Sequence, residues 1–256
     1  MKEENFIPLI HNYCDRWCER CRFIMRCRVG VEEVERLNQG KTDPEDMYQI
    51  VADNLRKALE MLEKYAKDNG IDWDKLQGEI DDVEIPEPTY TMEQDQLKEW
   101  GKEYIILGRD WFEHNELIIK SKEDELNHKV QIGIEGTTKQ AAQLVNAMEV
   151  IRWFLFFISV KMDRAIHGMQ SDLFDMDDLD PVQNDFNGSA KVALDAIERS
   201  LAAWEVVREN FPDTVDELID IFVLLGRMRK GMHRVFPLVN DFVRPGFDEP
   251  DLYAVE

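Results

Sequence analysis

The sequence lacks cysteine over almost its whole length. No cysteine follows Cys27 in a chain of 256 residues. The four that are present, Cys14, Cys18, Cys21 and Cys27, have the spacing C-x3-C-x2-C-x5-C. Such crowding indicates a shared chemical role, and the usual causes are a metal ion, an iron–sulfur cluster or disulfides.

A signal peptide is also missing from the N-terminal residues, which begin Met-Lys-Glu-Glu-Asn without a long apolar run. We therefore expect a cytoplasmic protein, in a reducing compartment where disulfides rarely persist. A chain of this length can bury a core without disulfide staples. Both points favour metal or cluster ligation over disulfides as the use of the thiols.

Positive charge and long apolar runs are scarce. The chain has 31 Lys and Arg against 53 Asp and Glu, a net charge of −22, and such a surface repels nucleic acid and anionic membranes. The most apolar stretch, 153–160, lies between Arg152 and Lys161 and is far shorter than the roughly 20 residues of a membrane span. We expect neither nucleic acid nor a membrane as partner.

Common catalytic motifs are absent as well. The sequence contains no dinucleotide-binding glycine motif, no H-E-x-x-H and no nucleophile elbow. Gly40-Lys41-Thr42 is not a phosphate-binding loop, because Glu35 stands where that motif needs a glycine. Whether the protein is an enzyme stays open, and no catalytic residue is assigned.

Helical periodicity dominates what is present. Apolar residues spaced three and four apart, with capping residues before them, predict helices at about 43–68, 93–120, 139–168, 189–210 and 213–235. We predict an all-α protein that forms a single helical domain over 1–256. Its parts are a cysteine segment at 11–28, a bundle of about five main helices over 43–235 and an irregular tail at 237–256. The oligomeric state is left open.

The cysteine spacing bears on the identity of the metal. If residues 13–22 are helical, Cys14, Cys18 and Cys21 share one face over two turns, about 10 Å along the axis. Zinc ligands must converge to within roughly 4 Å of one another, whereas a cubane cluster accepts wider spacing. We therefore expect a [4Fe-4S] cluster on the four cysteines. One Zn2+ is the alternative if the segment is a loop or knuckle.

Parts of this motif resemble known cluster motifs. The C-x2-C-x5-C of the last three cysteines resembles the cluster loop of helix-hairpin-helix DNA glycosylases and the motif of WhiB-type regulators. The first three, C-x3-C-x2-C, resemble the radical S-adenosylmethionine motif. These resemblances imply cluster ligation by the four cysteines and do not extend to the folds of those families. The string Tyr-Cys-Asp-Arg-Trp-Cys-Glu-Arg-Cys resembles the opening of a group of uncharacterised bacterial proteins, which implies no function.

Three functions are compatible with these features. The first is an iron–sulfur protein for electron transfer, redox sensing or fold stability. The second is a non-catalytic module stapled by zinc, whose acidic helices bind a protein partner. The third is an enzyme with a polar pocket on the 139–168 helix, formed by Glu149, Arg152, Lys161, Arg164 and His167. The alternative role of the basic residues near the end of this helix is to complement its dipole.

Overall fold

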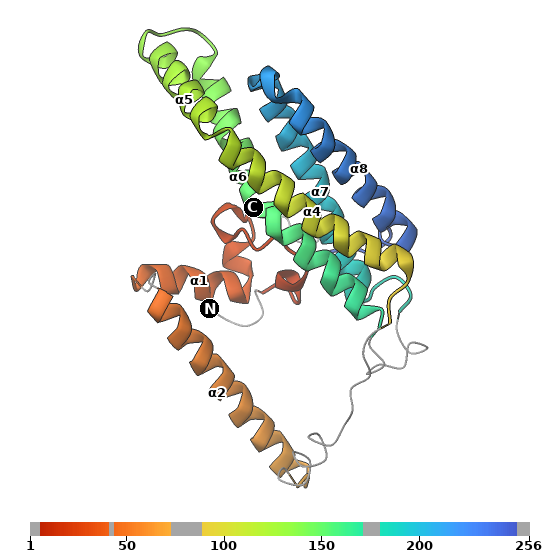
Figure 1. Ribbon diagram of the computed structural model, residues 1–256. Helices are drawn as coiled ribbons and strands as arrows, with labels where there is room; N and C mark the ends of the chain where they lie inside the picture. The colour runs from red at the N-terminus through yellow and green to blue at the C-terminus, as the bar shows by residue number, and fades with distance from the viewer. Residues whose placement is uncertain (1–5, 41–43, 73–88, 171–179, 250–256) are drawn as a thin grey trace. The chain divides into compact units, whose positions relative to one another are not determined.

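The computed structural model describes residues 6–40, 44–72, 89–170 and 180–249. Within these ranges all regular structure is helical and no strand occurs, which confirms the all-α prediction. The contacts divide the chain into two compact units where the sequence predicted one domain: Met1–His11 with Arg16–Pro88, and Asn12–Asp15 with Thr89–Glu256. Figure 1 shows the helices of both.

Among the described residues of the first unit, two α-helices follow a series of short turns. Helix α1 (Arg28–Asn38) follows two 3-10 turns, Cys18–Arg20 and Ile24–Arg26. The second of these turns packs closely on α1, because a Cβ atom at Gly30 would lie 2.6 Å from the carbonyl oxygen of Ile24. No helix was expected at α1, whose 11 residues give only a short periodic pattern.

Helix α2 (Pro44–Asp68) matches the helix predicted over 43–68. Its proline at the first position suits a helix start, since the fixed φ is compatible with the helix and the missing N–H has no intrahelical partner there. After the helix, Gly70 adopts a φ of 68°, and the Ile71 amide donates to the Ala66 carbonyl at 2.8 Å. This left-handed residue ends the helix in the way expected of a C-terminal glycine.

The second unit is built on a ring of four packed helices. Helix α4 (Met92–His114) contacts α6 (Thr137–Gly168), α6 contacts α7 (Asp185–Asn210), α7 contacts α8 (Val215–Val235), and α8 contacts α4. Figure 1 shows these four helices side by side. Large aromatic side chains fill the space between them, with the rings of Trp111 and Trp204 edge-to-face at 5.3 Å and the Trp204 indole donating to the Tyr104 hydroxyl at 3.1 Å.

The chain breaks after α4 earlier than the sequence predicted. One helix was expected over 93–120 with a polar connector after it, but α4 ends at His114 and a new helix, α5 (Glu116–Gln131), follows. The expected boundary was therefore wrong. Asn115 is buried at the break, and its side-chain amide donates to the Trp111 carbonyl at 3.0 Å and to Glu217 of α8 at 2.9 Å. An asparagine that bonds the preceding turn competes with continuation of the helix.

Helix α6 forms the centre of the second unit. By length and composition alone it could cross a membrane, although 44% of its most apolar window is buried inside the protein. Its buried side chains include Ile151, Phe154 and Ile158, each at 0% exposure, and it packs on α4, α5 and α7. A core helix of a helical bundle has this same composition.

A glycine in the first turn of α7 permits a tight aromatic contact. Tyr13 and Phe242 lie edge-to-face with ring centroids 4.8 Å apart. A Cβ atom at Gly188 would lie within van der Waals distance of both rings, 2.6 Å from Cζ of Phe242. A side chain at this position would force at least one of the rings to shift, and the Phe242 ring is buried, so glycine is favoured here.

We expect Gly188→Ala to lower the free energy of unfolding by about 2 kcal/mol, because overpacking a filled site costs about 1–3 kcal/mol. Gly226→Ala in α8 is the matched control, since no atom outside its own helix lies within 4 Å of the added Cβ. It should raise stability by about 0.5–1 kcal/mol through helix propensity. Urea unfolding of both variants measures these changes in the free energy of unfolding. Equal effects in the two variants would show that the space beside Gly188 is not filled.

The residues after α8 are held on α7 by partly exposed ion pairs. Arg244 pairs with Asp195 of α7 and with Asp248 at 2.8 Å, and Lys191 of α7 reaches Asp248 at 3.1 Å. Burial opposes ionisation of Asp248, but hydrogen bonds from the Arg244 side chain and backbone outweigh it and lower the pKa from 3.8 to about 2. The ionised carboxylate therefore stabilises the folded chain.

This shift predicts a pH dependence with a definite sign. The contribution of Asp248 is complete above its unfolded pKa of 3.8 and is lost as pH falls towards about 2. Wild type should exceed Asp248→Asn in stability by about 2 kcal/mol at pH 6, and the difference should shrink towards pH 2. Chemical unfolding across this range tests it, with exposed Asp241→Asn as control. A difference that stays constant with pH would contradict the shift.

Candidate metal centre

The cysteine segment does not form a continuous helix over 13–22, the conformation under which its spacing favours a cluster over zinc. Residues 18–20 and 24–26 form separate 3-10 turns, and Cys21 lies between them with extended backbone (φ −83°, ψ 119°). Arg16 adopts a φ of 59°, which is incompatible with a right-handed helix through the segment. The condition of a helix over 13–22, on which the preference for a cluster depended, is not met, so the spacing along a helix axis no longer disfavours zinc.

Three of the cysteines mark the ends of these short turns. The Cys21 amide donates to the Cys18 carbonyl at 3.1 Å, the Ile24 amide to the Cys21 carbonyl at 3.3 Å, and the Cys27 amide to the Ile24 carbonyl at 3.4 Å. The chain therefore turns three times in succession between Cys18 and Cys27. A C-x2-C pair in a tight turn is a frequent arrangement in structural zinc sites.

Cys27 occupies the N-cap of α1. Its sulfur accepts a hydrogen bond from the Gly30 amide at 3.4 Å, and the residue is 8% exposed. The first turn of a helix has amide hydrogens without an intrahelical partner, and the Cys27 sulfur accepts one of them. A thiolate is the form of cysteine that binds metals.

The structure does not assemble a complete metal site. Among the described residues, which include all four cysteines, no group of three or more His, Cys, Asp or Glu side chains is placed to hold a metal ion. Cys18, Cys21 and Cys27 belong to the first unit, whereas Cys14 belongs to the second. Metal binding by the four therefore stays a prediction from their spacing and local conformation.

Arginine and aromatic side chains alternate around the cysteines of the first unit. The guanidinium of Arg20 lies 3.9 Å from the centroid of the Trp17 ring, and that of Arg22 lies 4.6 Å from the Phe23 ring. Trp17 and Phe23 are buried. Stacked guanidinium groups keep their charge, so these residues place positive charge next to the cysteine turns while the rings exclude water.

The short segment that carries Cys14 is anchored to α6 and α7 of its own unit. Hydrogen bonds and an ion pair connect Lys161 Nζ with the Asn12 carbonyl (3.2 Å), Trp153 Nε1 with the Asp15 carbonyl (2.9 Å) and Arg199 with the Asp15 carboxylate (2.6 Å). Residues 12–15 thus have fixed partners on either side of Cys14. The sequence gave no signal for these contacts, because they connect residues more than 130 positions apart.

The five residues assigned to a polar pocket all lie on α6, and most have separate partners. Arg152 lies over the ring of Phe112 (4.6 Å), Lys161 binds the Asn12 carbonyl, Arg164 pairs with Asp185 (2.7 Å) and His167 contacts the Tyr90 hydroxyl (3.0 Å). Lys161 is buried, whereas Glu149 and the other three are exposed. None of the five lines either of the cavities described next. The pocket stays a prediction.

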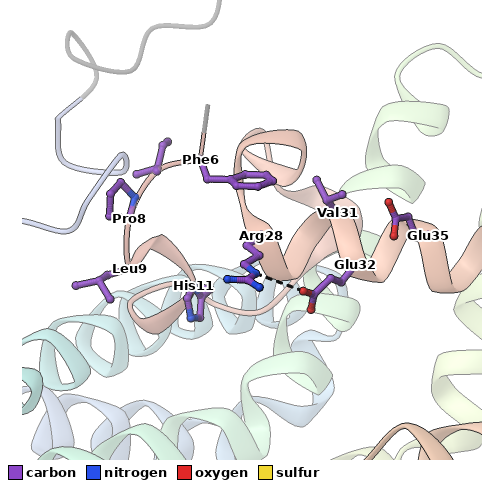
Figure 2. Close-up of a pocket in the computed structure, with 9 residues that line it drawn as sticks. Phe6, Pro8, Leu9, His11, Arg28, Val31, Glu32 and Glu35 are labelled. Atoms are coloured by element: carbon purple, nitrogen blue, oxygen red, sulfur yellow. Dashed lines mark ion pairs between the residues drawn. The ribbon is translucent and has the colours of Figure 1, made fainter. Parts of the chain in front are cut away.

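Sequence reasoning missed a groove beside the cysteine turns in the first unit. It has a volume of about 550 Å³ and is lined by Phe6, Ile7, Pro8, Leu9, His11, Arg28, Val31, Glu32 and Glu35. Figure 2 shows Arg28 and Glu32 paired beside His11. Burial lowers the pKa of His11; Arg16 adds to this effect and Glu32 opposes it. Leu9 at the rim has a φ of 58°, which costs a non-glycine residue about 1 kcal/mol.

A second, smaller cavity lies in the second unit. It has a volume of about 300 Å³ and is lined mainly by apolar groups, including Met169, Phe186, Phe236 and Leu238. Asn184, the N-cap of α7, also lines it, and its side chain accepts from the Asn187 amide at 2.9 Å. The polar side chain at this rim therefore already serves to cap the helix.

No known protein-family model, curated protein or solved structure matches the chain. The only basis for assigning a function is therefore the chemistry of its own residues. The cysteine turns and the anchored segment that carries Cys14 are the features with the clearest chemical meaning.

The anchoring of residues 12–15 is testable through Lys161. Lys161→Met keeps the length and helix propensity of the side chain but leaves the Asn12 carbonyl without this donor, at a cost of about 1–3 kcal/mol. We expect lower stability and faster amide exchange at Cys14 and Asp15, measured by hydrogen–deuterium exchange. Arg152→Met, the same change on an exposed cation of α6, should alter neither. Equal exchange in both variants would show that Lys161 does not hold the segment.

Proposed function

We propose that this protein is a cytoplasmic metalloprotein that binds a [4Fe-4S] cluster through Cys14, Cys18, Cys21 and Cys27. Its cluster would serve electron transfer, redox sensing or fold stability. The observation that carries the proposal is the environment of Cys27, a buried sulfur that accepts an amide hydrogen bond at the N-terminus of α1. Closely spaced cysteines with amide hydrogen bonds to sulfur are typical of such clusters.

The charges near the cysteines support the same proposal. Four thiolates on a [4Fe-4S]2+ core leave a net charge of about −2, which is costly to bury without compensation. Five arginines between positions 16 and 28, two of them stacked on Trp17 and Phe23, supply positive charge in a chain that is otherwise strongly acidic. Amide donors and nearby cations also tune the reduction potential of a cluster.

The number of ligands limits what the centre does. Four protein thiolates leave no open coordination position, so substrate chemistry at the metal is disfavoured. Electron transfer, sensing and structural stabilisation need no open position. A role in one of these three is therefore preferred to catalysis.

A single zinc ion is the second candidate, and the turn between Cys18 and Cys21 favours it. This turn has the C-x2-C spacing and tight conformation of structural zinc sites, with the Cys21 amide bonded to the Cys18 carbonyl. Zinc would then act as a staple for an interaction module that meets a protein partner. The cluster and the zinc ion differ in colour and redox behaviour, so measurements on one protein preparation distinguish them.

The first experiment is metal analysis of protein purified without oxygen. A broad visible absorption band with about four iron and four sulfide per chain supports the cluster. A colourless protein with about one zinc per chain supports the staple and removes redox chemistry. Protein that contains neither metal and recovers none on anaerobic reconstitution would overturn both.

Cys27→Ser separates loss of metal from loss of folding. Serine is among the best N-cap residues, so α1 keeps its cap while the thiolate is removed. We expect bound iron, or zinc, to fall severalfold, while helical content measured by circular dichroism stays nearly unchanged because most helical residues lie in the second unit. His11→Gln, three residues before Cys14, is the control and should retain the full metal content. Full metal content in Cys27→Ser would show that this sulfur is not a ligand.

A further inference from the structure

Helix α2 presents an apolar face to solvent. Seven of its large apolar residues are between 51% and 77% exposed: Tyr48, Val51, Leu55, Leu59, Met61, Leu62 and Tyr65. Of the charged residues between them, Asp53 pairs with Arg56 at 2.9 Å. A contiguous apolar face of this kind on a helix usually marks a site of association.

The spacing on this face follows a heptad repeat. Tyr48, Leu55 and Leu62 stand seven residues apart, and Val51, Ala58 and Tyr65 form the second series, three positions after the first. These are the a and d positions of a coiled coil, in which each side chain inserts between residues of a facing helix. The pattern therefore specifies a helical partner with the same spacing.

We infer that α2 pairs with α2 of a second copy of this chain, antiparallel, in a two-fold symmetric dimer. The seven side chains expose on the order of 800 Å², an upper limit for burial by pairing that is comparable with the roughly 800 Å² per partner of a standard stable interface. The helix has 25 residues and is about 37 Å long, enough for the three heptads used. A second copy necessarily supplies a facing helix of matching length and spacing.

Side-chain size decides between the two orientations. The antiparallel alignment places Tyr48 opposite Tyr65, Val51 opposite Leu62 and Leu55 opposite Ala58 of the partner. Each small residue then faces a large one, so the layers fill evenly. A parallel pair would place Ala58 opposite Ala58 and leave a void in the middle of the interface, which costs stability.

Sedimentation equilibrium of the full-length protein, purified without oxygen, measures the assembly directly. We expect a mass of twice the 30.1 kDa of one chain at about 10 µM. Leu62→Glu should raise the dissociation constant roughly a hundredfold, because the two-fold axis introduces two buried charges. Leu117→Glu on α5, at a position 81% exposed, is the control and should leave the dimer intact.

A pair of charge variants tests the orientation. In the antiparallel dimer, Leu55→Lys with Ala58→Glu places a lysine opposite a glutamate in both central layers, whereas Leu55→Lys with Ala58→Lys places like charges opposite each other. The first variant should therefore associate at least roughly tenfold more tightly than the second. In a parallel dimer both variants pair like charges and should be weakened equally. A monomeric wild type overturns the inference, as does a dimer unaffected by Leu62→Glu; equal association of the two charge variants overturns the antiparallel arrangement.

Discussion

The burial of α6 is the interaction on which the second unit depends. Helices α4, α5 and α7 all pack on it, and its central residues Ile151 and Phe154 are fully inaccessible. Because so much of its apolar surface is covered, α6 also fixes where its polar residues lie. Lys161 and Trp153 can hold residues 12–15 only because the helix that carries them is rigidly packed. The core thus determines the position of Cys14.

The first unit is organised by hydrogen bonds over short distances in the chain. Its cysteine turns are closed by backbone bonds between residues three apart, and Cys27 caps α1 through its sulfur. The segment buries only a small set of large apolar side chains, Ile7, Ile10, Trp17 and Phe23, and small segments of this kind commonly depend on a metal for stability. This is the physical link between the local conformation and the proposed cluster or zinc ion.

Much of the fold could be predicted from the sequence, because long periodic segments such as 43–68 and 139–168 encode helices locally. The break at Asn115 could not, since it depends on a hydrogen bond to Glu217, far along the chain. The four cysteines were identifiable from spacing alone, but their conformation was not. The left-handed backbone of Arg16 and the successive turns after it leave no periodic signal. The groove at His11 was missed because its lining comes from two short segments with no motif.

The assignment of residues 12–15 to the second unit affects how the protein can be divided. Their neighbours His11 and Arg16 belong to the first unit, so the chain crosses between the units twice within a few residues. A fragment that starts at Thr89 would lack the ring of Tyr13 and leave a space beside Phe242 and Gly188. No single cut in the backbone therefore yields two intact units. Separating the two units, in evolution or by engineering, would require residues 12–15 to be provided as a separate peptide or replaced by other residues.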